Sequence, residues 1–379
     1  MAKLSLERMR NEIASYLETT GAEALIGTSP ENVYYSSRSY IHTMFSIRLR
    51  YGIVLFPKID APVFIVQRIE ERLAKSQSWI EDIRAYSGIE FEDAPGIKLL
   101  AEAMHDRNIT KGNVLIDKSY ICANYLDELQ GLFPNIVFKD GSYIFQRLRM
   151  IKADEEIELL QKGALATEKA ILQAYASAKP YDVEKEVSDT MISNLLRNGA
   201  DLLAGMTWAA GREMTLMAHT KAGSKRILPG DTIRVDVGGF FKGYRSDVVR
   251  MAVVGKPSPK QNKVYMDLID IHRKLRERLT VGTRCCDIFA LGESLYEKAG
   301  YTLKSSLLGH SIGTECHEFP ILSKSEKEPL QAGMVMCVEP AIRVEDIGGF
   351  HIEDLMLVTD NGPKLLSTAT SIDEMYVIE

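Results

Sequence analysis

The hydrophobic pattern of this 379-residue chain changes near residue 150, and each side of that point predicts a different class of domain. Before it, short apolar runs alternate with stretches of helical spacing, the first of which carries Leu6, Met9, Ile13 and Leu17. The strand-like runs are residues 24–26, 52–56, 63–66 and 114–116, and a helix is expected over about 95–104. Because strands alternating with helices favour a mostly parallel sheet with helical cover, we predict an α/β domain over residues 1–150.

Residues 151–379 begin with long helices and continue with strands and turns. Asp154 is the expected N-cap of the first helix. Further helices are expected over about 182–198, 259–279 and 286–299, and strands over 232–237, 247–253 and much of the C-terminal segment. The whole chain is longer than one hydrophobic core usually supports, so we predict that residues 151–379 form a second domain of the α+β class.

Charge and cysteine content narrow the class of protein. The net charge of −6 does not suggest a nucleic-acid or anionic-membrane partner. No apolar run reaches the roughly 18 residues of a spanning helix, and the charged N-terminus does not resemble a signal peptide. The five cysteines are odd in number and lack CxxC spacing, as expected of free thiols in a reducing compartment. We therefore expect a cytoplasmic protein that binds neither membranes nor nucleic acid.

Two acids, Asp236 and Asp247, lie in a segment with the pattern of one hairpin, in which two apolar runs flank a glycine-containing turn. If the hairpin turns at Phe241 and Lys242, the two acids lie directly opposite each other, with Cβ atoms roughly 4.5–5.5 Å apart. Carboxylates that close repel each other unless a cation lies between them. Taken alone, the pattern is met more often in solvated acids on an exposed sheet face.

Three further residues offer metal ligands. Glu339 follows an apolar run and should lie at a strand end. Glu353 lies within the strand-like run 350–358, where alternation places it on the same face as His351. His310 lies in a short apolar stretch that ends in glycines. Each alone is more often a hydrogen-bonded or surface residue, but together with the two aspartates they form an oxygen-rich set with one imidazole, which suits Mn²⁺, Co²⁺ or Fe²⁺.

In order and local context these residues resemble the pita-bread metallopeptidases, the relatives of prolidase, aminopeptidase P, methionine aminopeptidase and creatinase. The resemblance is carried by Asp236, Asp247, Gly309-His310-Ser311-Ile312-Gly313 with His317-Glu318, Glu339-Pro340 and Ile352-Glu353-Asp354. It implies a pita-bread catalytic domain over residues 151–379. Residues 1–150 resemble, less specifically, the smaller creatinase-like N-terminal domain of the same proteins.

The resemblance implies two divalent metal ions and a ligand set for them. Asp236 and Asp247 would hold the first ion, and His310 and Glu339 the second. Asp247 and Glu353 would bridge both ions. Mn²⁺ or Co²⁺ is favoured for these sites, with Fe²⁺ and Zn²⁺ as alternatives.

The resemblance also implies catalytic roles and an activity. His219 would contact the substrate and help proton transfer, His317 would lie beside the developing oxyanion, and Glu339 would accept the proton of the attacking water. The implied reaction is hydrolysis of a C–N bond in a small peptide or other small amide, most typically by an Xaa-Pro dipeptidase. Homodimers are common in the family, so a homodimer is expected.

Three positions depart from the family pattern and leave the substrate open. His351 stands where family peptidases usually carry Arg, and an imidazole cannot copy the bidentate contacts of a guanidinium. We expect His351 to support the metal ligands by hydrogen bonding, with an extra metal ligand or a contact to the substrate as the alternatives. Val249 stands where a Thr commonly follows the second Asp, and Ser311 replaces a glycine. The alternative to a peptide is a non-peptide or cyclic amide, as in ectoine- or creatine-type hydrolases.

Other classes of function fit parts of the sequence less well. The segment from Gly309 to Gly313 matches the G-x-S-x-G elbow of serine hydrolases, with Ser311 as nucleophile, but the residues after it are not helical. Cys316 and His317 are neighbours, and neighbours on a strand point to opposite faces, so they do not form a catalytic pair readily. A non-catalytic binding module is disfavoured because all five ligand positions are kept.

Overall fold

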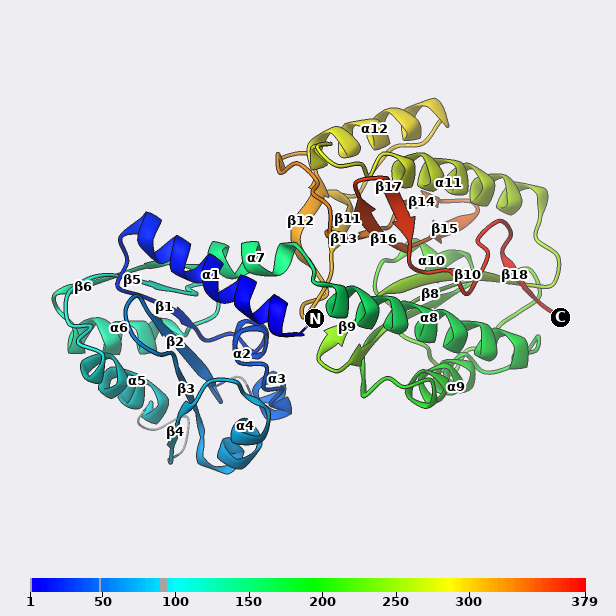
Figure 1. The fold of residues 1–379 in the computed structure, drawn as a ribbon. Coiled ribbons are helices and arrows are strands. Elements are labelled where there is room, and N and C mark those ends of the chain that lie inside the picture. The colour runs from blue at the N-terminus through cyan, green and yellow to red at the C-terminus, as the bar shows by residue number, and fades with distance from the viewer. Residues whose placement is uncertain (1, 48, 89–93) are drawn as a thin grey trace. The chain divides into compact units, whose positions relative to one another are not determined.

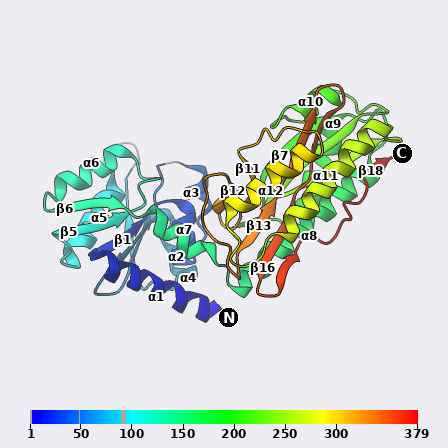
Figure 2. The ribbon, with the colours of Figure 1, turned by 90° about the horizontal axis from the view of Figure 1, so that it is seen from above.

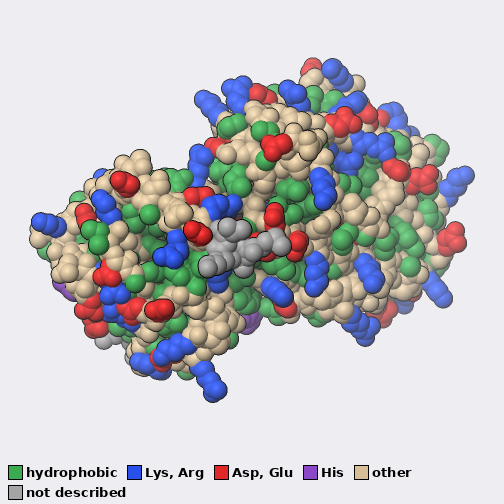
Figure 3. Space-filling view, in the orientation of Figure 1, with side chains coloured by type: hydrophobic (Ala, Val, Ile, Leu, Met, Phe, Trp, Pro, Cys, Tyr) green, Lys and Arg blue, Asp and Glu red, His purple; other side chains and the backbone are tan. Residues whose placement is uncertain are grey.

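The computed structural model describes residues 2–47, 49–88 and 94–379, and its contacts divide the chain into two compact units, residues 1–149 and 150–379 (Figure 1). The first unit is an α/β domain and the second is α+β, as predicted. No helix in the described part of the chain is both long and apolar enough to cross a membrane. On the face drawn in Figure 3, acidic and basic side chains are interspersed, in keeping with a net charge of only −6.

A six-stranded mixed sheet forms the centre of the first unit, in the order β4-β3-β2-β1-β5-β6. The strands are β1 (Ala24–Gly27), β2 (Ile53–Pro57), β3 (Val63–Gln67), β4 (Asp82–Tyr86), β5 (Gly112–Ile116) and β6 (Ile136–Asp140). Three pairings are parallel, but β2 is antiparallel to both β1 and β3. The expectation of a mostly parallel sheet is therefore met by three of the five pairings. The β2–β3 pairing is antiparallel because residues 58–62 are too few for a crossover to a parallel strand.

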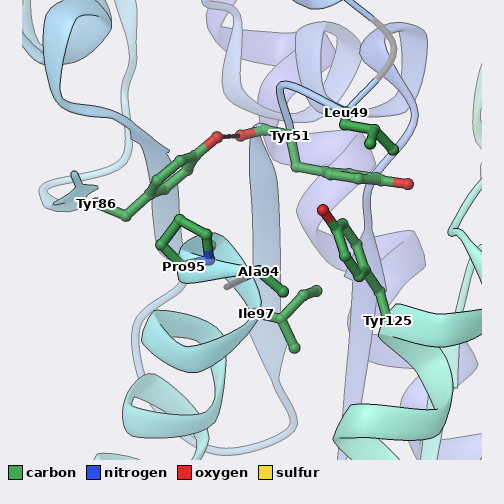
Figure 4. Close-up of a pocket in the computed structure, with 8 residues that line it drawn as sticks. Leu49, Tyr51, Tyr86, Ala94, Pro95, Ile97 and Tyr125 are labelled. Carbon is green, nitrogen blue, oxygen red and sulfur yellow. Dashed lines mark hydrogen bonds between the residues drawn. The ribbon is translucent and has the colours of Figure 1, made fainter. Parts of the chain in front are cut away.

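Helices cover both faces of this sheet. One face packs against α5 (Pro95–Asp106) and α6 (Ala123–Leu132), and the other against α1 (Ala2–Thr20), α2 (Pro30–Ser37), α4 (Glu71–Gln77) and α7 (Ser142–Met150). Leu25 and Ile26 point to opposite faces and both are fully buried, which explains why the strands read as unbroken apolar runs. A small hollow lined by Tyr51, Tyr86 and Tyr125 holds none of the predicted site residues (Figure 4).

Two main sheets and four long helices form the second unit. One sheet runs β18-β10-β8-β7 with the short β9 paired to β8, the other runs β12-β11-β13-β16-β17, and β14 pairs with β15. The strands are β7 (Leu202–Ala210), β8 (Thr232–Phe241), β9 (Tyr244–Arg245), β10 (Val248–Val254), β11 (Leu307–Ser311), β12 (Glu318–Ser323), β13 (Val335–Val338), β14 (Ala341–Val344), β15 (Gly348–His351), β16 (Asp354–Thr359), β17 (Gly362–Leu365) and β18 (Tyr376–Ile378).

The helices of the second unit lie on two sides of its strands (Figures 1 and 2). Helices α8 (Asp154–Ser177) and α9 (Glu184–Arg197) pack against the β7–β8–β10 sheet, and α11 (Pro259–Glu277) and α12 (Cys285–Lys298) against the β11–β12–β13 sheet. The expected N-cap of α8 is wrong by one residue, because Ala153 holds the extended cap position and Asp154 begins the helix. The Glu156 carboxylate accepts the Ala153 N–H at 2.8 Å, which satisfies the cap from within the first turn.

Candidate metal centre

The hairpin that carries the first two acids turns at Lys242 and Gly243, one residue later than expected. Phe241 pairs with Tyr244 across the turn. Lys242 and Gly243 have φ angles of 50° and 82°. A two-residue type I′ turn needs a positive φ at both central positions, and glycine adopts such an angle without strain. The turn therefore forms where the glycine is, and the register of the hairpin shifts accordingly.

The shifted register pairs Asp236 of β8 with Val249 of β10, so the predicted direct opposition of Asp236 and Asp247 is wrong. Asp247 lies just before β10 begins, diagonal to Asp236. Asp236, Asp247 and Glu353 nevertheless each offer a carboxylate oxygen, and these oxygens lie within 4.8 Å of one another. The two acids approach each other because residues two apart on a strand share a face.

Glu353 lies at a break between two strands and not inside one. The run 350–358 was expected to be a single strand, but β15 ends at His351 and β16 starts at Asp354. The break is held by the peptide N–H of Glu353, which donates to the Val249 carbonyl at 3.3 Å, and by the guanidinium of Arg250, which donates to the Glu353 carbonyl at 2.5 Å. A buried side-chain and main-chain network therefore sets the position of this glutamate.

His310 of β11 and Glu339, immediately after β13, face each other across neighbouring strands. The His310 Nε2 atom is 3.4 Å from Glu339 Oε1 and 3.9 Å from Glu353 Oε1. Its Nδ1 atom lies 3.0 Å from the Ser311 carbonyl oxygen, which can only accept a hydrogen bond. Nδ1 therefore carries the proton and Nε2 presents its lone pair toward the carboxylates, which is the arrangement of a metal-binding histidine.

His317 lies against His310, with ring centroids 3.9 Å apart and planes inclined by 20°. Ligand atoms of His310, His317 and Glu339 come within 4.8 Å of one another. His351 is on the other side of Glu339, with its Nε2 atom 3.4 Å from Glu339 Oε2. His219 is the exception among the predicted residues, because it is exposed after α10 (Arg212–Leu216) and belongs to none of these groups.

The electrostatics of the cluster reflect an excess of buried negative charge. Burial raises the pKa of Asp247 well above its usual value, and the charge of Asp236 raises it further. Burial likewise raises the pKa of Glu353, with added repulsion from Asp247 and Glu339. Carboxylates in such a position are ionised only when a cation compensates them. The cluster therefore carries excess negative charge that a bound cation would neutralise.

The imidazoles have the opposite effect on their carboxylate neighbour. Burial tends to raise the pKa of Glu339, but the adjacent His351 and His310 outweigh it and the pKa is lowered. Burial lowers the pKa of His310 itself, which favours the neutral, ligating form. Glu339 and His310 thus place a carboxylate beside an imidazole, a pair with the donor types that divalent transition metals bind.

Unpartnered polar atoms supply a direct test of whether a metal fits. Glu339 Oε1 and Glu353 Oε1 are shielded from solvent and accept no hydrogen bond from any described residue. Buried carboxylate oxygens without partners are costly, and natural proteins normally satisfy them. Together with the five converging donors, these oxygens fit a site for divalent metal. The predicted ligands are therefore brought together in space, while their roles stay predictions.

Two cysteines in the site were not predicted from the sequence. The Cys316 thiol donates to Asp247 Oδ2 at 2.9 Å. The Cys337 sulfur lies within 4.8 Å of ligand atoms of His310 and Glu353. Burial raises the pKa of both thiols, and the nearby carboxylates raise it further. Cys316 is therefore a protonated donor and not the nucleophile of a Cys–His pair.

Ser311 is held as a structural residue. Its hydroxyl contacts Lys152 Nζ at 2.7 Å, and the same ammonium group donates to Glu318 Oε2 at 3.0 Å. The three side chains are buried. No helix follows β11 in the described structure, since the next element is β12. The nucleophile-elbow alternative for Ser311 lacks the strand–turn–helix geometry that it needs.

Comparison with known proteins identifies the family and the fold. Residues 158–360 match Metallopeptidase family M24, and residues 9–151 match the Creatinase/Prolidase N-terminal domain. The chain belongs to metallopeptidase family M24. As a member of that family, it is a metal-dependent hydrolase of amide bonds, and the two domains have the fold expected from the resemblance.

Relatives of this M24 protein align over almost its whole length. The chain is 28% identical over 358 residues to the Xaa-Pro dipeptidase of Pyrococcus horikoshii, covering 94% of this chain and 95% of the relative. The solved prolidase structure from P. horikoshii superposes with a TM-score of 0.83 at 26% identity, covering 96% and 99% of the two chains. An Xaa-Pro dipeptidase structure from Bacillus anthracis has a TM-score of 0.86 at 23% identity over 98% and 99%, and shares the fold.

Proposed function

We propose that this M24 hydrolase is an Xaa-Pro dipeptidase-like peptidase with a dinuclear metal centre held by Asp236, Asp247, His310, Glu339 and Glu353. The observation that carries the proposal is the convergence of these five side chains, with the oxygens of Asp236, Asp247 and Glu353 within 4.8 Å of one another and the His310–Glu339 pair 3.4 Å apart. A relative that aligns over 94% of the chain is named Xaa-Pro dipeptidase, which supports the substrate class.

The ligand types support Mn²⁺ or Co²⁺ as the ions. The set holds four carboxylates and one imidazole, and oxygen-rich sites of this kind suit harder divalent ions better than thiolate sites do. The two nearby thiols are protonated and held by carboxylates, so they do not turn the centre into a sulfur site. Fe²⁺ and Zn²⁺ are the alternatives. We also propose that the protein forms a homodimer.

When bound, two divalent ions supply a Lewis acid for the scissile carbonyl and lower the pKa of a water toward neutrality. Glu339 holds the place of the general base, because its carboxylate has one unpartnered oxygen beside His310. His317, stacked on His310, is positioned to donate to negative charge that develops on the carbonyl oxygen. His219 is exposed and free to contact the part of the substrate outside the metal cluster.

A non-peptide or cyclic amide is the second candidate substrate, and one observation favours it. The Nε2 atom of His351 lies 3.4 Å from Glu339 and is buried without a hydrogen-bond partner in the described structure. An imidazole at this place offers one donor or acceptor, whereas the Arg usual in family peptidases offers a planar fork for a carboxylate. A substrate that is not held through a bidentate contact to a carboxylate would need no such fork.

The experiment is turnover by chelator-stripped enzyme with and without added Mn²⁺ or Co²⁺. The substrates are Xaa-Pro dipeptides, longer Xaa-Pro peptides, non-proline dipeptides and small cyclic amides, and Asp236→Asn is the matched variant. Metal-restored cleavage confined to Xaa-Pro dipeptides, and lost in Asp236→Asn, is the expected result. Metal binding with turnover of cyclic amides alone would favour the second candidate over the dipeptidase. A turnover rate that is unchanged by the chelator and by Asp236→Asn would refute the metal centre.

A further inference from the structure

Asp236 is flanked on both sides within its sheet, by Val249 of β10 and by Thr207 of β7. Both are its direct antiparallel partners in the register. Side chains of direct partners project from the same face, with Cβ atoms roughly 4.5–5.5 Å apart. Thr207, Asp236 and Val249 therefore form one row across three strands, and the carboxylate lies between a hydroxyl and an isopropyl group.

The hydroxyl in this row has no partner. Thr207 Oγ1 is shielded from solvent, yet it makes no hydrogen bond to any part of the described structure. Val249, on the opposite flank, is fully buried and has no polar side-chain atom. Natural proteins seldom leave a buried hydroxyl unpaired, so such a group calls for an explanation in a ligand, a water or an ion. Here the nearest polar side chain in the row is the proposed metal ligand Asp236.

We propose that Thr207 is a positioning residue of the metal centre, whose hydroxyl donates a hydrogen bond to the Asp236 carboxylate and orients it as a ligand. The inference rests on the proposed function, since it needs Asp236 to bind metal. A hydroxyl is a donor as well as an acceptor, and an ionised carboxylate only accepts, so the pair is chemically matched. Because Val249 cannot donate, Thr207 is the side chain in the row that can hold this carboxylate from within the sheet.

Hydrogen-bond partners of metal ligands affect affinity directly. Removing such a partner typically weakens metal binding by about 10- to 100-fold, because the ligand then loses its fixed orientation. Threonine and valine have nearly the same shape, so Thr207→Val deletes the donor without opening a cavity. Thr207→Ser keeps the hydroxyl. The double variant Thr207→Val with Val249→Thr moves the hydroxyl to the other flank of the same carboxylate.

The test measures dissociation constants of Mn²⁺ and Co²⁺ by competition with a chromophoric chelator, using the stripped full-length protein and its variants. Thr207→Val should raise the dissociation constant of one of the two ions by about 10-fold or more. Thr207→Ser should bind metal nearly as tightly as the wild type, and the double variant should recover affinity. The thermal midpoint of the stripped protein should stay unchanged in Thr207→Val, which separates a positioning role from loss of folding.

Thr232→Val is the matched control, because Thr232 is on β8 with an equally buried, unpartnered hydroxyl and lies four residues from Asp236. It should bind metal like the wild type. Wild-type affinity in Thr207→Val would overturn the inference, as would a Thr207→Ser variant that binds as weakly as Thr207→Val. Absence of metal binding in the wild type would refute the proposed function instead, so the two failures are distinguishable.

Discussion

His272 is fully buried in α11. Its Nε2 atom is 3.8 Å from Asp354 Oδ2, next in sequence to Glu353. Burial lowers the pKa of His272 to about 4, although Asp354 acts in the opposite direction. The folded protein therefore keeps this imidazole neutral over a pH range in which the unfolded chain protonates it.

The first prediction follows from this difference. Between about pH 6.5 and pH 4 the unfolded chain binds more protons at His272 than the folded one, so stability rises with pH across that window and is lost as pH falls. Lowering the pH from 7.5 to 5.5 should cost wild type about 1.4 kcal/mol of unfolding free energy more than His272→Gln, as measured by urea denaturation. Parallel pH dependences of the two proteins would contradict the buried neutral state.

Some residues of the site could not be found from the sequence because no local pattern marks them. Cys316 and Cys337 contact or approach carboxylates only through the fold, and Thr207 is ordinary until the register places it beside Asp236. The five predicted ligands were found because their order and spacing resemble a family. His219 matched the same pattern but lies outside the cluster, since the pattern records order along the chain and not distance.

At the scale of the element, the β8–β10 hairpin depends on a close backbone contact at Gly238. A Cβ atom there would lie 1.8 Å from the Ser246 carbonyl oxygen. Side chains cannot tolerate such an approach, and the atom in the way is main chain that cannot rotate aside. Glycine at this position lets the segment that leads into Asp247 lie against β8. The packing of the hairpin therefore helps to position a predicted metal ligand.

The second prediction compares two glycines of the same sheet. Gly238→Ala should push the 246–247 backbone away, lower the unfolding free energy by about 2 kcal/mol or more, and weaken metal binding together with it. Gly205→Ala on β7 is the control, because an added Cβ there meets nothing within 4 Å. Urea denaturation and chelator competition check both variants. If both variants lost stability and metal affinity equally, the close contact at Gly238 would not be what positions the metal site.

Elements were predicted better than their ends and registers. The apolar runs of β1, β2, β3 and β5 and the helices α5, α8, α9, α11 and α12 were expected, because continuous or periodic hydrophobicity marks them. The hairpin turn was placed one residue early, although Gly243 marks the second central position of a type I′ turn in the sequence. The break at Glu353 was missed because the apolar pattern runs through it, and hydrogen bonds from Arg250 and to Val249 decide it.

At the scale of the whole molecule, every predicted metal ligand belongs to the unit of residues 150–379. The first unit has its own cores on the two faces of its sheet. An ion that binds only the folded state stabilises it, by about 2.7 kcal/mol at a free concentration 100 times its dissociation constant. Metal should therefore stabilise the second unit, whose buried carboxylates otherwise repel one another.

The last prediction concerns hydrogen exchange of the stripped protein with and without saturating Mn²⁺ or Co²⁺. Protection should increase in peptides from β8, β10, β11, β13 and β16, which carry or adjoin the ligands, because opening these strands releases the ions. Peptides from β1, β2 and β5 should exchange at the same rate in both conditions, since their sheet lies in the unit without ligands.

Asp236→Asn is the control for that experiment, because it removes one ligand charge from the centre while the amide keeps the size of the side chain. Its metal-dependent protection should shrink, whereas its exchange without metal should match that of the wild type or be slower. Slower exchange is reasonable because the variant also removes a charge that repels Asp247. Equal gains of protection in both units would mean that the ions act on the whole chain and not through these ligands, whereas a gain confined to residues 150–379 and dependent on Asp236 ties the stability of that unit to its metal.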